Sequence, residues 1–248
     1  MKIVAIGGGE IGRPGYSIET TKMDKELIHL SGKNNPKVLF IPTASGDSNE
    51  YGEIFKKHFG QRLGCKTDIL YLIKEKLSKK EIQKKIFNAD IIYVGGGNTA
   101  KLMKVWRKTG VDKMLQEAGK RGIVLSGLSA GSMCWFKNGL SDSRKFNNPN
   151  AGMIKVAGIN LVNALHCPHY DVELHRKNDL KETMKKTPGV AIAIDNCCAL
   201  EIVDDKYRII NSKKGAKAYK VYWKNNKFYE EVIEQDKNYK PLSEILIK

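Results

Sequence analysis

The first half of the chain alternates short apolar runs with helix-like patterns, and this alternation restricts the possible folds more than any other feature. Segments that alternate in this way form a mostly parallel sheet with helices on both faces, so we predict an α/β fold. The predicted strands are Lys2–Ile6, Val38–Pro42, Asp68–Leu72, Ile91–Val94 and the run before Ser129. The predicted helices lie near Ile18–Leu30, near Asn49–Leu63, at Ser78–Phe87, at Thr99–Arg107 and from there through Gly119.

The second half of the chain follows a different pattern. We predict a loop rich in glycine, asparagine and serine from Asn138 to Gly152, and a helix near Val172–Lys186. The closely spaced apolar runs that follow predict antiparallel strands at one edge of the sheet. They lie at Val190–Ile194, Ala199–Val203, Tyr207–Ile210, Ala218–Trp223 and Lys227–Tyr229. Because 248 residues without a linker-like stretch suffice for one buried core, we expect a single domain over residues 1–248.

Hydropathy and cysteine content set the expected compartment. The apolar run at the N-terminus is too short for a signal peptide, and no segment approaches the roughly 20 apolar residues of a membrane span. We therefore expect a cytoplasmic protein with no membrane partner. The five cysteines show no Cys-x-x-Cys spacing, which predicts free buried thiols in place of disulfides or a structural zinc site.

The formal net charge of +16 raises the question of nucleic acid binding. Lysine supplies nearly all of the excess, and in patterns such as Leu77–Phe87 the lysines occupy the helix faces that apolar residues leave free. Arginine, the residue best suited to bidentate phosphate recognition, is sparse. We interpret the lysines as a solvated surface and expect no nucleic acid partner.

A Gly-Leu-Ser-Ala-Gly motif, Gly127 to Gly131, follows a buried-strand pattern and begins a helix predicted from Ala130 to Phe136. Gly-x-Ser-x-Gly between a strand and a helix is typical of the sharp turn that exposes a nucleophilic serine. The two glycines permit a strained backbone, and the N–H groups of the helix point at an incoming carbonyl oxygen. Ser129 is therefore the candidate nucleophile; the alternative is that it only caps the helix.

Two glycine-rich loops follow predicted strands at the same edge of the sheet. Gly7 to Gly12 formally matches the dinucleotide fingerprint, but the second strand ends without the acidic residue that would bind a ribose. We interpret its first three glycines as part of the wall of a site.

The second loop, Gly95-Gly-Gly-Asn-Thr99, contains successive glycines that can turn N–H groups toward one point. This suits an oxyanion hole formed by the N–H groups of Gly97 and Ala130. The alternative is an ordinary turn in which Asn98 or Thr99 caps the next helix.

A serine needs a general base to become a strong nucleophile, and the chain has five histidines. His29 and His58 lie in helical patterns before the serine, where a histidine usually packs or faces solvent. The segment from Leu165 to Asp171 contains a proline that fixes an extended or turn conformation, so a side chain there can reach across the sheet edge. His169 is our candidate base, and His166 is the second choice.

Three motifs in register resemble the peptidase E family of serine peptidases, which includes aspartyl dipeptidases and the related cyanophycinases. The resemblance implies a three-layer α/β fold similar to the class I glutamine amidotransferases, with serine in place of their nucleophilic cysteine. It also implies Ser129 as nucleophile, His169 as base, and the N–H groups of Gly97 and Ala130 as oxyanion donors. The motifs are Val94-Gly-Gly-Gly-Asn-Thr99, Gly127-Leu-Ser-Ala-Gly131 and Pro168-His-Tyr170, and their order and spacing fit almost the whole chain.

The third member of the catalytic set departs from the family pattern. The family places an acidic residue in a short loop after a late strand, and Asn196 occupies that position, one residue after Asp195. An amide can orient an imidazole, but it cannot stabilise the imidazolium with a full charge. Asn196 is our candidate and Asp195 and Asp142 are the alternatives, although Asp195 and Asn196 also suit a plain turn between two strands.

The resemblance therefore implies a serine peptidase that acts on short peptides through a Ser–His mechanism and needs no cofactor. A preference for N-terminal Asp would require a cation, for which Arg144, Lys145 and Arg176 lie near the right segments. The alternatives are a cyanophycinase-like hydrolase of β-aspartyl amides and a non-catalytic binding module that keeps the fold. The expected partner is a short peptide, and a homodimer is the candidate assembly.

A zinc site is the remaining candidate near the predicted base. We expect no metal there, because no second ligand cluster completes a known zinc spacing. The residues considered were His166, Cys167, His169 and His175.

Overall fold

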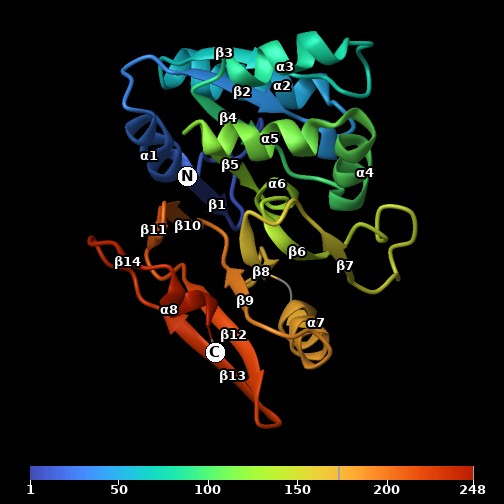
Figure 1. Ribbon diagram of the computed structural model, residues 1–248, viewed down its shortest axis with the longest axis vertical. Helices are drawn as coiled ribbons and strands as arrows, with labels where there is room; N and C mark the ends of the chain where they lie inside the picture. Colours follow the sequence, from blue (N-terminus) through green and yellow to red (C-terminus); the bar gives the residue numbers. More distant parts are fainter. Residues whose placement is uncertain (173, 248) are drawn as a thin grey trace.

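Five strands from the first half of the chain form the parallel part of an eight-stranded sheet in the computed structural model, which describes residues 1–172 and 174–247 (Figure 1). Their order is β1-β5-β4-β2-β3, and all four pairings are parallel, which confirms the predicted α/β fold. The strands are β1 Lys2–Ile6, β2 Lys37–Ile41, β3 Lys66–Ile69, β4 Ile91–Val94 and β5 Val124–Leu128.

The position of β3 corrects the prediction of Asp68–Leu72. Lys66 pairs with Lys37 at the start of the edge strand, and Leu70 already lies beyond its end. The first residues of this edge strand are polar and show no apolar pattern, so the predicted strand begins two residues too late.

Residues of each strand alternate between two apolar cores, one on each face of this sheet. Val4 and Ile6 face the core that includes α1, α2 and the π-helical turn η2, whereas Ile3 and Ala5 face the core that includes α3, α4 and α5. Because both faces are buried, these strands read as continuous apolar runs. The elements are α1 Thr21–Ser31, η1 Thr43–Ser45, α2 Asn49–Phe55, η2 Lys56–Arg62, α3 Lys79–Phe87, α4 Thr99–Thr109 and α5 Val111–Lys120.

Antiparallel strands complete the large sheet on the side of β1, as the sequence predicted. β10 pairs with β1, β11 with β10, and the short β14 with β11. These strands span Cys198–Val203, Lys206–Asn211 and Lys240–Pro241, and helix α8, Ser243–Leu246, follows β14.

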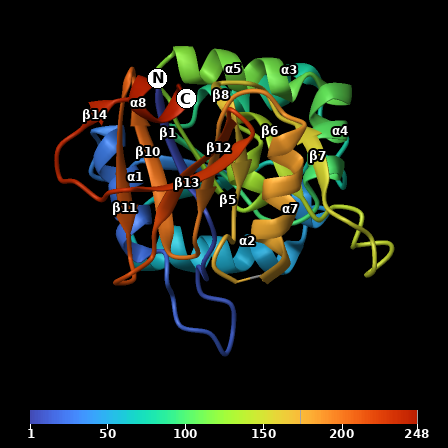
Figure 2. The same ribbon diagram turned by 90° about the horizontal axis from the view of Figure 1, so that it is seen from below.

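A second sheet of six strands, which the sequence did not predict, lies below the large sheet in Figure 1 with helix α7 beside it. Its order is β13-β12-β9-β8-β6-β7, so three of the predicted late strands belong here and not to the edge of the large sheet. Figure 2 views the molecule from this end. The elements are β6 Phe136–Ser141, β7 Ile154–Ala157, β8 Val162–Cys167, α7 Leu174–Lys185, β9 Ala191–Ile194, β12 Ala218–Lys224 and β13 Lys227–Ile233.

Strand β6 occupies the start of the segment predicted as a loop from Asn138 to Gly152. It also ends the predicted helix early, because α6 covers only Ala130–Met133. Asn138 and Gly139 are weak strand formers, so the sequence pattern of β6 predicted a loop. Gly139 is required there, since a Cβ at this position would lie 2.6 Å from Sδ of Met133.

All five cysteines are buried and carry free thiols. Within residues 1–172 and 174–247, no helix is both long and apolar enough to cross a membrane. The same ranges contain no group of three or more His, Cys, Asp or Glu side chains arranged to hold a metal ion.

Candidate active site

Ser129 lies on the turn between β5 and α6 with φ 56° and ψ −115°, a conformation that residues other than glycine rarely adopt. Its N–H donates to the carbonyl oxygen of Ile6 at 3.1 Å, which ties the turn to the end of β1. A Cβ at Gly127 would lie 2.4 Å from the oxygen of Gly131, and a Cβ at Gly131 would lie 2.0 Å from the oxygen of Val94. The two glycines therefore allow the close backbone contacts that hold a half-buried serine in this strained turn.

His169 follows β8 in a turn with φ 54°, and its N–H donates to the carbonyl oxygen of Gly7 at 3.2 Å. Ile6, which accepts the hydrogen bond from Ser129, directly precedes Gly7 in the chain. The two candidate catalytic residues are therefore anchored to adjacent positions. Nδ1 of His169 lies 2.6 Å from Oδ1 of Asn196. An amide oxygen only accepts, so Nδ1 carries the proton, and in the neutral ring the lone pair is on Nε2.

Gly8 lies directly against the His169–Asn196 pair. A Cβ at Gly8 would lie 2.0 Å from Oδ1 of Asn196 and 2.5 Å from Nδ1 of His169. The loop of Asn196 is held by two further bonds: its own N–H donates to Oδ1 of Asp171 at 2.8 Å, and the N–H of Cys197 donates to Gly8 at 2.9 Å. The sequence indicated the glycine loop as a wall of the site but gave no signal for Asp171.

The predicted oxyanion donors lie on loops that follow the neighbouring strands β4 and β5. Gly97 has φ 135°, and a Cβ there would lie 2.5 Å from the oxygen of Ala44, so only glycine fits. A Cβ at Gly96 would lie 3.5 Å from Cβ of Ser129, which places this loop alongside the serine. Among the described residues, no acceptor bonds the N–H of Gly97 or that of Ala130, the first residue of α6.

His166, the second choice for the base, is fully buried with both ring nitrogens engaged. Nδ1 lies 2.9 Å from the oxygen of Ile192 and Nε2 lies 2.9 Å from Oγ of Ser132, while the ring stacks on Phe136 at 4.5 Å. Burial lowers the pKa of His166 to about 4, so the ring is neutral near pH 7. Oγ of Ser132 also lies 2.7 Å from the oxygen of Ser129. The geometry gives His166 a role in supporting the serine turn.

The other histidines lie in helices or helical turns away from these loops. His58 is buried, with Nε2 2.7 Å from Oδ2 of Asp24, and this pair packs between η2 and α1. His29 and His175 are exposed on α1 and α7.

Of the two alternative acids, Asp195 has its carboxylate bonded to another partner, and Asp142 lies on a different turn. Oδ2 of Asp195 accepts the N–H of Lys217 at 2.9 Å, and burial raises the pKa of this carboxyl to about 6. Asp142 begins the turn between β6 and β7, where its carbonyl oxygen accepts the N–H of Lys145 at 2.7 Å. Of the candidate cations, Arg144 is exposed on the same turn and Arg176 is buried in α7.

A family model described as Peptidase family S51 matches residues 3–210. The chain belongs to peptidase family S51. It is 36% identical to the uncharacterized peptidase YgaJ of Bacillus subtilis (strain 168), over 89% of this chain and 91% of that protein. It is 28% identical to the peptidase E of a Nostoc species, over 76% of this chain and 78% of that protein. These findings confirm the resemblance to peptidase E and support a peptidase function.

Solved structures share the S51 fold over most of the chain. A peptidase from an acI-B1 Actinobacterium superimposes with a TM-score of 0.73 at 19% identity, covering 97% of this chain and 96% of that one. A putative peptidase E of Listeria monocytogenes EGD-e gives 0.64 at 23% identity, covering 85% and 98%. The predicted fold class is therefore confirmed by structures as well as by sequence.

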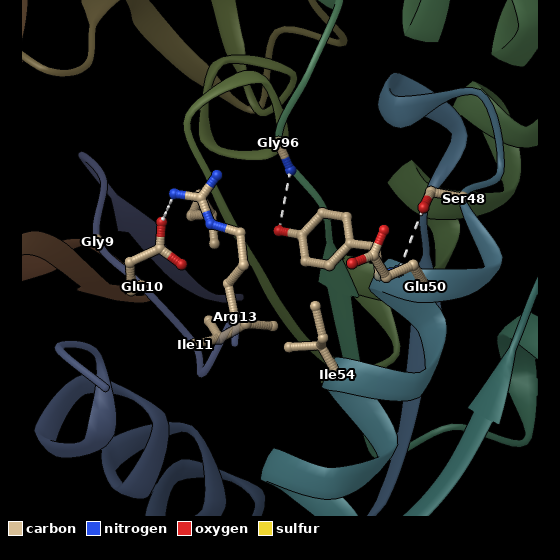
Figure 3. Close-up of a pocket in the computed structure, with 10 residues that line it drawn as sticks. Gly9, Glu10, Ile11, Arg13, Ser48, Glu50, Ile54 and Gly96 are labelled. Atoms are coloured by element: carbon tan, nitrogen blue, oxygen red, sulfur yellow. Dashed lines mark hydrogen bonds and ion pairs between the residues drawn. The ribbon is translucent and has the colours of Figure 1, made fainter. Parts of the chain in front are cut away.

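Beside the serine turn, the S51 chain forms a cavity of about 300 Å³ (Figure 3). Its wall comes from the loop after β1, from α2, and from the ends of β4 and β5. Figure 3 shows the guanidinium of Arg13 paired with Glu10. The N–H of Gly96 donates to the Tyr51 hydroxyl at 3.4 Å. The sequence motifs did not reveal this cavity, because its lining residues are far apart in the chain.

Because His166 is buried and neutral, the protein should lose stability as the pH falls, and the variant His166→Gln should lose less. As pH falls below 6.5, the unfolded chain protonates this histidine while the native state does not until about pH 4, so stability present above pH 6.5 is lost. Between pH 7 and pH 5, wild type should lose about 2 kcal/mol more of its unfolding free energy than the variant does. Urea unfolding of both proteins at the two pH values measures this difference. The carboxyl of Asp195 also titrates in this pH range, but it does so in both proteins, so its effect cancels in the difference. Equal losses of unfolding free energy in wild type and variant would contradict the neutral, buried state of His166.

Proposed function

We propose that this S51 peptidase hydrolyses short peptides, with Ser129 as the nucleophile and His169 as the general base. The observation that best supports the proposal is the 2.6 Å hydrogen bond between Nδ1 of His169 and Oδ1 of Asn196. It fixes the tautomer in which Nε2 can take a proton, which is the orienting task of the third member of a catalytic triad.

The proposed mechanism proceeds in two stages. Nε2 of His169 removes the proton of the Ser129 hydroxyl as Oγ attacks the scissile carbonyl, and the resulting oxyanion accepts hydrogen bonds from the N–H groups of Gly97 and Ala130. His169 then gives its proton to the leaving amine, and an acyl-enzyme remains. Water, activated by the same imidazole, hydrolyses the ester and releases the acyl product. These steps use no cofactor.

The proposed role of Asn196 predicts unequal effects for two substitutions. Asn196→Ala removes the acceptor of the His169 proton, so kcat/KM should fall about tenfold to a hundredfold through misorientation of the base. Asn196→Asp keeps an acceptor at the same place and adds a charge, which should preserve activity and move the acidic limb of the pH–kcat/KM profile to higher pH. Steady-state assays from pH 5 to pH 9 on both variants measure the effects.

Activity unchanged in Asn196→Ala would remove this residue from the mechanism. If Asp195→Ala or Asp142→Ala then abolished turnover in a folded protein, an acid would complete the triad. Thermal melting of each variant checks that the protein is folded.

The substrate class within this proposal is tested first with dipeptides that carry N-terminal Asp, Glu or a neutral residue, and then with β-aspartyl amides. A non-catalytic binding module is favoured by one observation, the neutral amide at the third catalytic position. A serine-reactive fluorophosphonate probe separates the two functions. Labelling at Ser129 together with peptide turnover supports the enzyme, whereas absence of both supports the binding module.

A further inference from the structure

We propose that the cavity beside Ser129 binds an uncharged, apolar side chain of the peptide substrate, on one of the two residues that flank the scissile bond. This inference rests on the proposed function, because it names the side chain that the same site accepts.

The cavity lies next to the candidate nucleophile. Gly96 and Leu128 both line it, and a Cβ at Gly96 would lie 3.5 Å from Cβ of Ser129 and 3.4 Å from Cδ1 of Leu128. Its volume of about 300 Å³ is at the lower end of the roughly 300 to 1,000 Å³ of small-molecule pockets. A single side chain adjacent to the reacting carbonyl therefore suits its size and position.

The inner wall of the cavity is apolar. Ile11 and Leu128 are 4% and 9% exposed, and Ile54 of α2 lies on the same side of the cavity as Ile11 (Figure 3). Burial raises the pKa of Tyr51 to about 12, so its phenol is neutral and contributes a ring to the wall. An apolar side chain loses water favourably on this wall, whereas a carboxylate would lose its hydration without a partner.

The charged residues at the cavity also disfavour an acidic side chain. Among the described residues that line it, Arg13 carries the single positive charge, and this guanidinium is paired with Glu10 and lies 4.2 Å from the ring centre of Tyr16. Glu50 adds a second carboxylate at the exposed side of the cavity. A substrate carboxylate would therefore meet an excess of negative charge.

Two series of dipeptides, X-Ala and Ala-X with X as Leu, Phe, Gly or Asp, test the inference on the wild-type protein. In one of the two series, kcat/KM for Leu or Phe should exceed that for Gly and for Asp by about tenfold or more, the size expected for burial of such a side chain. In the other series the cavity makes no contact, so no such preference is expected from it.

Variants of two lining residues connect the preference to the cavity. Ile54→Trp fills the space and should lower kcat/KM for Phe about tenfold while changing that for Gly little. Glu50→Lys should raise the ratio of Asp to Leu turnover about fivefold, as expected for a charge change at an exposed position. Glu53→Lys is the matched control, since Glu53 lies on the same helix but outside the cavity and should leave the ratio unchanged.

The outcomes separate the inference from the function on which it rests. Turnover with Asp preferred over Leu in both series, or equal effects of Ile54→Trp on Phe and Gly, would overturn the inference and leave the serine peptidase intact. Absence of both probe labelling and turnover for every peptide would overturn the proposed function, and this inference with it.

Discussion

Ser129→Ala is expected to lower peptide hydrolysis by about a thousandfold or more while leaving the fold intact. Without Oγ no acyl-enzyme can form. The activity that remains comes from the oxyanion donors and from substrate binding. The backbone of this turn is held by Ile6 and by the close packing of the glycines around it, so removal of a half-buried hydroxyl should leave the turn in place. Initial rates on the best dipeptide, together with thermal melting, measure both parts of the expectation.

Ser31→Ala is the matched control for this substitution. Ser31 ends α1, where its hydroxyl donates to the oxygen of Ile28, and it lies outside the serine turn. The control should keep both full activity and labelling by a fluorophosphonate, and Ser129→Ala should lose both. Full turnover by a folded Ser129→Ala protein would remove the nucleophile from the proposal and with it the serine mechanism.

The sequence predicted the parts of this molecule that depend on local pattern. Both faces of the central strands are buried, so β1 and β4 read as continuous apolar runs, and their bounds were predicted correctly. Strand β5 was predicted as the apolar run before Ser129, without bounds, and it spans Val124–Leu128. The turn at Ser129 was also predicted, because the close approach of neighbouring backbone requires glycine at positions 127 and 131. A requirement of the backbone leaves a signal in the sequence.

Features built from distant segments were harder to predict. Asp171 bonds the backbone of Asn196 across 25 positions of the chain, and nothing in its local sequence distinguishes it from an ordinary turn residue. The cavity combines Ile11, Ile54 and Leu128 from three separate elements. Each of these is an ordinary apolar residue within its own helix, strand or loop, so only the tertiary structure shows that they share a wall.

The second sheet illustrates a different limit. Its strand β6 contains Asn138 and Gly139, and these residues are tolerated because β7 and β8 pair with it on either side. Tertiary pairing overrides a weak local preference, and the sequence then reads as a loop. This sheet matters for the site, because β8 leads directly to His169 and β9 leads to Asn196.

His169→Ala should be as damaging as the loss of the serine, with a fall in kcat/KM of about a thousandfold or more. Without an imidazole, no group removes the proton of Ser129 or returns it to the leaving amine. His29→Ala, on the exposed side of α1, is the matched control and should retain wild-type rates. Both are measured on the same dipeptide with folding checked by thermal melting.

The double variant Ser129→Ala with His169→Ala gives the sharper test of a shared mechanism. Groups that act as one unit are strongly non-additive, so the double variant should be slower than Ser129→Ala alone by no more than a few-fold. If the two losses multiply instead, the imidazole acts on something other than the serine proton. An active His169→Ala protein, with activity lost in a folded His166→Gln variant, would transfer the base to the buried histidine beneath the turn. The bonds of His166 to Ile192 and Ser132 argue against that transfer, because both of its nitrogens are already engaged.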